Sequence, residues 1–470
     1  MEFKHFLIFI LLIQLIGCAK DVVYDKPVVE SAAAFKELGS WVEVNSSQEL
    51  IKNDWWRLFN DQTLDQLESK IDDSNPNLSA FLARLEQSRA YTLTLSSQST
   101  PNVNAIAQAT NNRQSDHRPL RGGSQPDVYG TNTLGLSIDY DLDLWGRIKG
   151  LVSSGKSLEK SSMSDLANAR VGLQTELASN YFELRRFDAQ VLLYQQTIQS
   201  YEKQLKLTNE LHEQGVVSGL DVSRALAQIE TIKGYLLIAE SNRAKCEHAI
   251  AVLLGQSPSL FSIPFAQLDI LKYPEIPVNV PSSLLERRPD IASAASKLAS
   301  ANAAIGVAKT AYFPNINLGL IAGFQNTGNL GLLTAPNLFW ALGPSAVLNV
   351  FDGGKRDAQV KIAISKRDEL ASEYKSVVLR AFKEVEDSLS MVGSLNKQIV
   401  SAENTRSAVK HSNDLVMNRY FEGIVSSFEV VKANDDLLNA NEVLLNIKIN
   451  NLEARLALVH ALGGGWVSEN

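Results

Sequence analysis

The pattern of apolar positions along the chain predicts two pairs of long helices. Apolar side chains recur at heptad spacing between residues 177 and 253, and the spacing returns between 430 and 461. Heptads of this kind are typical of a coiled-coil seam. The seam positions of the first pair are Leu177, Leu184, Val191, Ile198 and Leu205 on the outgoing segment and Val222, Ile229, Leu236, Arg243 and Ile250 on the returning one. In the second pair the outgoing segment keeps the seam less well, because Arg406 and Asn413 fall on it.

Shorter segments alternate between apolar and polar residues with a period of two, which predicts β-strands. The apolar faces are Ile316, Leu318, Leu320, Ala322 and Phe324 in one segment, Leu134, Leu136, Ile138 and Tyr140 in another, and the weaker Val103, Ala105, Ala107 and Ala109 in a third. Because the chain repeats itself, as described below, each copy is expected to contain one β-hairpin, which gives two hairpins and four strands. Each strand is expected to have about nine to eleven residues, the length that spans a membrane when tilted.

The predicted elements occur twice, because the chain is a tandem duplication. Three glycine pairs are separated by 208 residues, namely Gly146 and Gly354, Gly215 and Gly423, and Gly255 and Gly463. Upstream the offset is 213, as for Pro76 and Pro289, so the first copy carries five extra residues before its first long helix. Each copy is predicted to contain a helix, two strands, a long helix, a tight tip and a returning helix.

The duplication also predicts the domain organisation. The expected segments are a signal peptide (1–17), a lipidated N-terminal segment (18–75), a first repeat (76–255) with a β-hairpin (102–141) and a helical hairpin (146–254), a proline-rich linker (256–288), a second repeat (289–463) with a β-hairpin (315–351) and a helical hairpin (354–462), and a C-terminal tail (464–470).

Helix lengths constrain how these elements pack. An outgoing helix of about 67 residues is roughly 100 Å long, whereas a returning helix of about 35 residues covers only roughly 52 Å. The helix that opens the first repeat, from Pro76 to about Ser99, adds roughly 36 Å by the same rise. We expect it to stack end to end on the returning helix and cover the rest of the long one.

The number of strands predicts an oligomer. Four strands cannot close a barrel, and an open sheet edge in lipid leaves backbone groups without partners. Two chains give eight strands and an interior filled by side chains, whereas three give twelve strands and an open lumen. The strand count favours three chains only if passage through the lumen is the purpose.

Composition excludes several classes of protein. The chain has 470 residues, 45% apolar and 21% charged, with a net charge of −7, which is ordinary for a folded protein but unlike a nucleic-acid binder. Its two cysteines exclude a disulfide scaffold and a Cys-based zinc site. The six histidines show no metal-ligand spacing, and Cys246 falls on the heptad seam, where a small buried hydrophobe is expected. We therefore predict neither catalysis nor a bound metal or cofactor.

The N-terminus is predicted to be a lipoprotein signal. The apolar run Phe6–Gly17 follows Lys4 and is too short to span a bilayer, which is typical of a secretory signal. It ends in Leu15-Ile16-Gly17-Cys18, which resembles the bacterial lipobox, so Cys18 would carry diacylglycerol and an N-acyl chain. Ala19 in the next position favours the outer membrane over the inner one. Plain cleavage after Ala19 is the alternative.

Several motifs together resemble the TolC-type outer membrane factors, especially the lipoprotein branch that serves resistance–nodulation–division pumps. The motifs are Trp55-Trp56-x-x-Phe59, Tyr140-Asp141-Leu142-Asp143-Leu144-Trp145-Gly146-Arg147, Leu284-Leu285-x-Arg287-Arg288-Pro289-Asp290-Ile291, Phe313-Pro314-Asn315-Ile316 and Phe351-Asp352-Gly353-Gly354-Lys355. The resemblance implies a mixed α/β membrane protein, a homotrimer with a coiled-coil helical barrel and a twelve-stranded outer membrane β-barrel. It also implies export of small toxic compounds, received from an inner membrane pump through a periplasmic adaptor.

The resemblance assigns the hairpin tips to the periplasmic entrance and to adaptor contact. The matching positions are Gly215, Ser218, Asp221, Gly423, Ser426 and Glu429. The glycines permit a left-handed turn and the two serines can cap the returning helices, so tight turns without a further role are an equal alternative. Some relatives carry an acidic constriction one turn further on, where this chain has Arg224, Lys432, Asp435 and Asp436. A solvated helix face is the alternative to a constriction there.

Two other functions fit parts of the pattern. A lipid-anchored coiled-coil tether would explain the lipobox and the heptads, but not two hairpins of membrane-spanning length at equal repeat positions. A channel of the same fold could serve type I protein secretion, because the inner membrane partner mainly chooses the cargo. The N-terminal tryptophans Trp41, Trp55 and Trp56 are expected to cover the helices.

Overall fold

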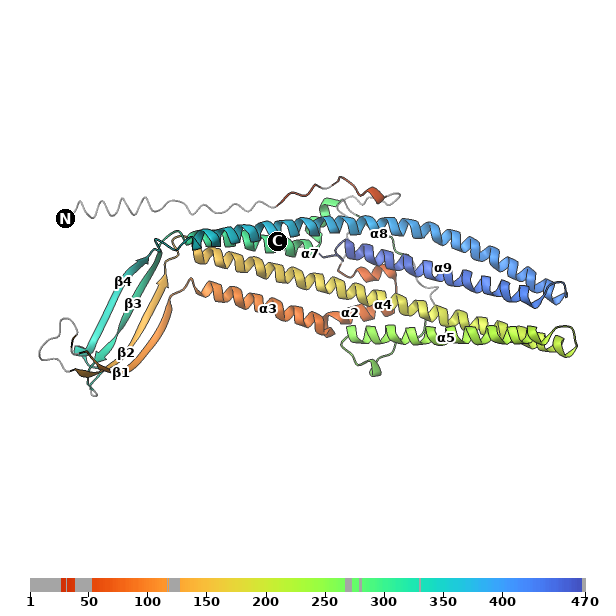
Figure 1. Ribbon diagram of the computed structural model, residues 1–470, viewed down its shortest axis with the longest axis horizontal. Coiled ribbons are helices and arrows are strands. Elements are labelled where there is room, and N and C mark those ends of the chain that lie inside the picture. Colours follow the sequence, from red (N-terminus) through yellow and green to blue (C-terminus); the bar gives the residue numbers. More distant parts are fainter. Residues whose placement is uncertain are drawn as a thin grey trace. The chain divides into compact units, whose positions relative to one another are not determined.

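The chain folds into long helices and one four-stranded antiparallel sheet, in the element order expected from the duplication (Figure 1). The computed structural model describes residues 27–30, 32–38, 53–115, 117, 127–266, 273–278, 281–328 and 331–466. The predicted signal peptide, Cys18 and Trp41 lie outside these residues. Among the described residues, no helix has a stretch that is long and apolar enough to cross a membrane.

The helices of each repeat have matching lengths. The first repeat contains α3 (Pro76–Ser97), α4 (Arg147–Glu213, 67 residues) and α5 (Gly219–Leu253, 35 residues). The second contains α7 (Pro289–Thr310), α8 (Lys355–Phe421, 67 residues) and α9 (Ser427–Ala461, 35 residues). These lengths confirm the helix predictions. The shorter helices are η1 (Lys36–Leu38), η2 (Trp55–Phe59), α2 (Gln62–Ser74), η3 (Pro258–Leu260), η5 (Pro281–Ser283), α6 (Leu284–Arg287) and η6 (Ala335–Asn337).

The chain divides into two compact units, and each contains segments of both repeats. The first unit includes Leu85–Ser162 and Ala294–Tyr374, and with them the whole sheet. The second includes Val28–Arg84, Met163–Ser293 and Lys375–Asn470, and with them both hairpin tips. The repeats are therefore units of sequence rather than of compact structure.

In the first unit, the sheet joins the two repeats. Its strands are β1 (Asn102–Arg113), β2 (Val128–Asp141), β3 (Asn315–Asn326) and β4 (Leu338–Val347), in the order β1-β2-β3-β4. The first three have 12, 14 and 12 residues, more than the nine to eleven expected, because pairing continues past the apolar stretch. The fourth ends at Val347, four residues before the expected limit. Pairing of β2 with β3 leaves β1 and β4 as the edges.

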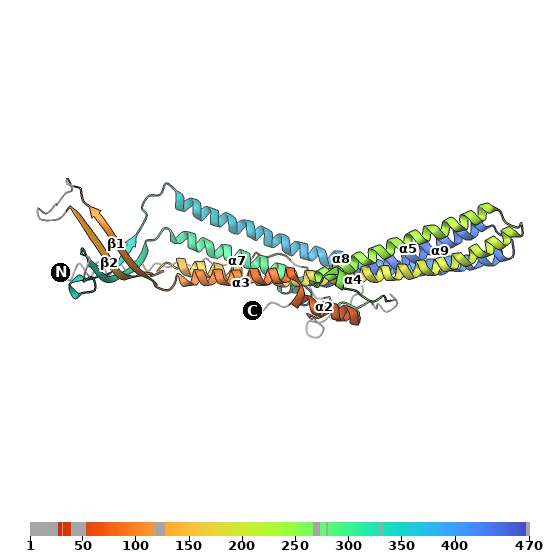
Figure 2. The same ribbon diagram turned by 90° about the horizontal axis from the view of Figure 1, so that it is seen from below.

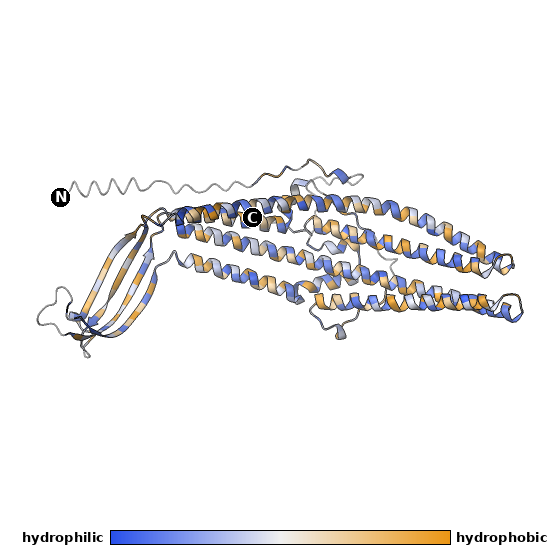
Figure 3. Ribbon diagram, in the orientation of Figure 1, coloured by the Kyte–Doolittle hydropathy of each residue, from blue (hydrophilic) through white to orange (hydrophobic). Residues whose placement is uncertain are grey.

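The register aligns apolar side chains in rows across all four strands. One such row is Val103, Ile138, Leu320 and Leu342, and the next is Ala105, Leu136, Ala322 and Trp340. Figure 3 shows the apolar and polar residues alternating along the strands. One face of the sheet is therefore apolar and the other mainly polar, because a strand's side chains point alternately to the two faces.

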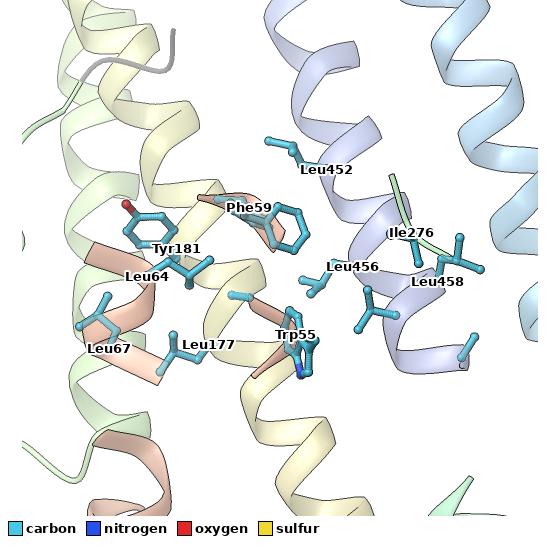
Figure 4. Packing of buried hydrophobic residues seen from close by; sticks show 14 of the residues in the cluster. Trp55, Phe59, Leu64, Leu67, Leu177, Tyr181, Ile276, Leu452, Leu456 and Leu458 are labelled. Atoms are coloured by element: carbon cyan, nitrogen blue, oxygen red, sulfur yellow. The ribbon is translucent and has the colours of Figure 1, made fainter. Parts of the chain in front are cut away.

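In the second unit, the core forms where the N-terminal segment packs on helices of both repeats (Figure 4). Trp55 and Phe59 are buried with Leu177 on α4 and Leu456 on α9. The Phe59 and Phe182 rings are 4.9 Å apart. Trp55 is 1% exposed and Trp56 packs against the same cluster, which confirms that both cover the helices.

Helix α2, within the N-terminal segment, was not predicted from the sequence. Asp61 caps it by accepting hydrogen bonds from the backbone N–H groups of Thr63 (2.8 Å) and Leu64 (3.0 Å). Leu64, Leu67 and Ile71 are its buried apolar residues. Their spacing of three and four residues is the sequence pattern that indicates a helix with one buried face.

Most positions of the heptad seams are buried as predicted, whereas Ile198, Leu205, Val222 and Leu236 are half-buried. On α4 the side chains of Leu177, Leu184, Val191, Phe187 and Tyr201 are all less than 9% exposed. On α5 and α9 the buried seam residues are Ala225, Ile229, Ile232, Ala239, Ile250, Val430, Ala440, Leu444, Ala454 and Leu458. Each long helix of a hairpin is therefore held to its returning partner by apolar burial, the dominant favourable term in folding.

Candidate functional site

Each hairpin tip is a tight turn that requires glycine. Gly215 and Gly423 have φ values of 77° and 74°, the left-handed region in which a side chain is disfavoured. In the first tip the Gly215 N–H donates to the His212 carbonyl (2.9 Å) and the Val216 N–H to the Leu211 carbonyl (2.9 Å). The second tip repeats the pattern with donors Gly423 and Ile424 and acceptors Tyr420 and Arg419. These bonds satisfy the last carbonyls of α4 and α8. Figure 2 shows both tips at the same end of the second unit.

The two predicted serine caps differ. Ser218 and Asp221 form a capping box on α5, in which Asp221 Oδ2 accepts the Ser218 N–H (3.0 Å) and hydroxyl (2.9 Å). Ser218 therefore occupies the predicted N-cap position, and its hydroxyl donates to Asp221 in the capping box. Ser426 occupies the N-cap position of α9, but its side chain makes no capping hydrogen bond. The prediction of a side-chain cap is wrong at Ser426, where Glu429 replaces Asp221 and makes no such bond with the serine.

Polar side chains join the first hairpin to the second near the tips. The Ser427 hydroxyl donates to Asp221 Oδ1, and Gln228 Nε2 donates to Asp435 Oδ1. The Ser427 hydrogen bond, together with those from Ser218, lowers the pKa of Asp221. Partial burial raises the pKa of Asp435, assisted by the negative charge of Asp436. The contact between α5 and α9 is polar at this end.

A second group of polar side chains includes Asn434, the residue next to Asp435. Asn434 on α9 donates to Gln204 on α4 (2.9 Å) and accepts from Asn413 on α8 (2.7 Å), so one side chain links both hairpins. Asn413 is only 7% exposed. Its side-chain amide is tolerated at this buried seam position because it is hydrogen-bonded to Asn434. Arg406, the other polar seam residue, donates to Asn441 Oδ1 (2.7 Å).

The four positions considered for an entrance constriction do not form one cluster in this chain. Arg224 lies over the Phe428 ring, 5.8 Å from its centroid, and Lys432 is 3.9 Å from Asp436. Asp435 is bound to Gln228 instead. All four are exposed, so within one chain they belong to a charged, solvated helix surface.

The tips also expose apolar side chains at matching repeat positions. Val216 and Ile424 are 65% and 60% exposed, and Leu220 and Phe428 are 57% and 58% exposed. We name these four residues the tip patch. These exposed apolar side chains occupy equivalent places on the two tips, where they are accessible to another molecule.

Two buried polar networks that hold the linker were not predicted from the sequence. In the first, the carboxylate of Asp188 contacts Arg185 (2.7 Å) and Arg243 (2.6 Å), and these arginines donate to the linker carbonyls of Pro264 and Ile263. In the second repeat Asn396 and Asn451 take the places of Asp188 and Arg243. Arg455, at the place of Glu247, donates to Asn451 and to the carbonyl of Pro274. The sequence did contain one sign of these networks: the polar residues Arg243 and Asn451 fall on otherwise apolar seam positions.

Each returning helix meets the next helix end to end, as helix lengths predicted. Asn75 Nδ2, at the start of α3, donates to the carbonyl of Leu253 at the end of α5 (2.7 Å). Arg288, before α7, donates to the carbonyl of Ala461 at the end of α9 (3.0 Å). The two junctions are repeat equivalents, and a glycine closes each one at Gly255 and Gly463.

Known proteins match the chain over the same two repeats. A family described as outer membrane efflux protein matches residues 67–256 and 280–464, which cover most of both repeats. The pyoverdine export outer membrane protein OpmQ of Pseudomonas aeruginosa is 27% identical over 418 residues, 88% of this chain and 88% of that protein. The probable efflux pump outer membrane protein TtgC of Pseudomonas putida is 28% identical over 455 residues, 96% of this chain and 94% of that protein.

Solved structures match over nearly the whole chain. The outer-membrane channel OprN aligns with a TM-score of 0.89 at 27% identity, covering 96% of this chain and 100% of that one. The open state of the MtrE outer membrane channel of Neisseria gonorrhoeae aligns with a TM-score of 0.83 at 25% identity, covering 95% and 98%.

Proposed function

We propose, since the chain belongs to the outer membrane efflux protein family, that it forms the outer membrane exit channel of a tripartite efflux pump. In this proposal three copies share one conduit. It passively conducts small toxic compounds that a resistance–nodulation–division pump delivers through a periplasmic adaptor. The proposal extends the outer membrane location shared by the relatives to a specific assembly and cargo class.

The observation that carries the proposal is a sheet with one apolar face and two unpaired edges. The apolar rows suit contact with lipid, but β1 and β4 each leave one side of the backbone unpaired. Unpaired backbone groups in hydrocarbon cost several kcal/mol each, so the sheet must close with copies of itself. Three copies give twelve strands, whose lumen is open, whereas eight strands leave a filled interior.

Single-channel recording in planar bilayers tests this proposal. The purified full-length protein is expected to give discrete open levels and to run as a trimer in detergent. A tether predicts no open level at any voltage, with or without an adaptor. That result, with a monomer in detergent, would overturn the channel.

The cargo proposed for this chain is based on what its relatives are named for. The two relatives above are named for pyoverdine export and for an efflux pump, and a further Pseudomonas putida protein of the same group is named for toluene efflux. We carry small-molecule export over to this chain on that similarity. Type I protein secretion becomes the preferred function if deletion of the chain leaves toxic-compound sensitivity unchanged but stops secretion of a protein.

The tips are proposed to receive the adaptor. Replacing both Gly215 and Gly423 with valine is expected to abolish export while trimers persist, because valine is disfavoured at positive φ and the turns must reorganise. Drug accumulation in intact cells measures export, and mild electrophoresis measures trimers. Gly234→Val, within α5 and with no atom within 4 Å of an added Cβ, is the matched control. Full export by the double variant would show that the tip turns are not required for export.

Cys18 is proposed to carry the lipid anchor. Cys18→Ser is expected to abolish acylation, because a serine hydroxyl does not replace the thiol in the lipobox reaction. Metabolic palmitate labelling measures this directly, with Cys246→Ser as the control for loss of a cysteine. Persistent labelling of the Cys18 variant would refute the lipobox assignment, whereas absence of labelling in the wild type would indicate plain cleavage after Ala19.

A further inference from the structure

We infer that Asp139 sets the ion preference of the channel, as a ring of one carboxylate from each copy at the helix-proximal end of the sheet. The inference rests on the proposed function, since it needs the sheet to close around a lumen. It assigns selectivity to the membrane segment rather than to the charged surface at the hairpin tips.

The polar face of the sheet has very little charge. Every residue pair in register shares a face, so the polar face can be read strand by strand. Its polar side chains are Asn102, Asn104, Gln108, Thr110, Asn112, Tyr129, Thr131, Thr133, Ser137, Asp139, Asp141, Asn315, Asn317, Gln325 and Ser345. Within the four described strands, this face carries two carboxylates and no lysine or arginine.

Only one of these two carboxylates is available to a passing ion. Asp141 contacts Arg147 at 2.7 Å, so its charge is neutralised within the chain. The Asp139 side chain is exposed, and its carboxylate forms no ion pair or hydrogen bond with the described residues. The net charge of this face is therefore that of Asp139.

Nearby carboxylates outside the strands are also engaged. Asp143 accepts the backbone N–H groups of Ile148 (2.8 Å) and Lys149 (2.9 Å) at the start of α4. Asp352 contacts the Arg356 guanidinium at 2.7 Å. These groups hold helix starts, so they are poor competitors for a mobile cation.

The neighbours of Asp139 leave its carboxylate unobstructed. Its row across the sheet is Asn102, Asp139, Gly319 and Gly343. A Cβ built on either glycine meets no atom within 4 Å, so open space adjoins the carboxylate on that side. Closure of the sheet places the polar face inside and brings one such row from each copy to the same level.

A ring of carboxylates in a channel with low-dielectric walls attracts cations and repels anions. Asp141 is paired with Arg147, and the remaining polar residues of this face are neutral, so they give no competing preference. We therefore expect the channel to prefer potassium over chloride, with Asp139 as the main determinant.

Reversal potentials across planar bilayers in asymmetric KCl test the inference. At an ionic strength of about 0.1 M, where screening acts over about 10 Å, the full-length wild-type channel is expected to show potassium preference. Asp139→Asn should move the reversal potential toward zero, and Asp139→Lys should reverse its sign. At about 1 M salt, where screening acts over about 3 Å, the variants should converge.

Two further variants separate charge from shape. Ser137→Asn changes size without charge one row away on the same strand face and should behave as wild type. Ser137→Asp combined with Asp139→Asn returns a carboxylate to that face and should restore the preference.

The outcomes distinguish this inference from the proposed function. A reversal potential unchanged by Asp139→Asn, with normal conductance, overturns the inference alone and assigns selectivity to the tip charges. A wild-type channel that conducts without preference overturns it equally. A wild-type protein that never conducts contradicts the proposed function, and the inference fails with it.

Discussion

Alanine at Gly255 or Gly463 is expected to destabilise the protein more than any other single methyl addition at a described glycine. Both glycines have positive φ (63° and 93°), which costs a residue with a side chain about 1–2 kcal/mol. The added Cβ would also lie 2.3 Å from the Ser74 carbonyl oxygen or 2.1 Å from that of Arg287. These acceptors are backbone atoms, so relief requires the end-to-end helix junction to open. We expect a loss of at least about 2 kcal/mol at each site.

Thermal unfolding in detergent, followed by far-ultraviolet circular dichroism, measures the effect as a lower apparent Tm. Gly172→Ala on α4 and Gly393→Ala on α8 are the matched controls, because an added Cβ meets no atom within 4 Å at either position. Alanine is favoured over glycine inside a helix by about 0.5–1 kcal/mol, so these controls should match or exceed the wild type. Equal melting of all four variants would show that the junctions do not depend on close contact.

Removal of the Asp188 carboxylate is expected to give the second large effect. Asp188 is fully buried and joins Arg185 and Arg243. Asp188→Ala therefore leaves the buried Arg185 guanidinium without its counter-ion and Arg243 with only the longer contact to Glu247 (3.5 Å). Breaking a buried ion pair from one side costs about 3–5 kcal/mol. The linker carbonyls of Ile263 and Pro264 would remain the arginines' acceptors. The variant should melt earlier and expose the linker to limited proteolysis.

The second repeat provides the matched control for this prediction. Asn396 occupies the equivalent place and accepts hydrogen bonds from Asn451 (2.9 Å) and Arg455 (3.3 Å). Loss of a neutral acceptor costs about 1–3 kcal/mol, so Asn396→Ala should lower the apparent Tm less than Asp188→Ala. Asn396→Asp adds a charge beside Arg455 and should melt no earlier than wild type. A larger loss from Asn396→Ala than from Asp188→Ala would contradict the argument from charge.

Much of the fold could be predicted because its signals are periodic and repeated. The heptads located both helical hairpins, and the glycines at equal repeat positions located both tips. The 67-residue and 35-residue helices occur where the patterns placed them. Patterns of this kind report burial directly, since apolar spacing and element geometry have the same period.

The missed features depend on contacts between distant segments. Helix α2 has no repeat equivalent to reveal it, and its cap depends on the conformation of Asp61. The absent cap at Ser426 shows that the residue type at an N-cap does not ensure the bond, because side-chain geometry decides it. The polar networks around Asp188 and Asn396 bind the linker, which is distant in sequence. In one of these hydrogen bonds, the donor Ala266 N–H lies 78 residues after the acceptor Asp188. No local pattern encodes such a pairing.

The amino-acid sequence alone determined the duplication, the four-strand count and the positions where the chain must turn. These follow from periodicity and from glycine's freedom at positive φ. The tertiary structure decided which of these residues act together. Register gave the sheet a nearly neutral polar face with Asp139 unpaired, and packing joined Asp221 to Ser427 and closed each helix junction on a glycine. Ion pairs and hydrogen bonds require contact within a few ångströms, so only the folded chain shows which polar groups are paired with one another.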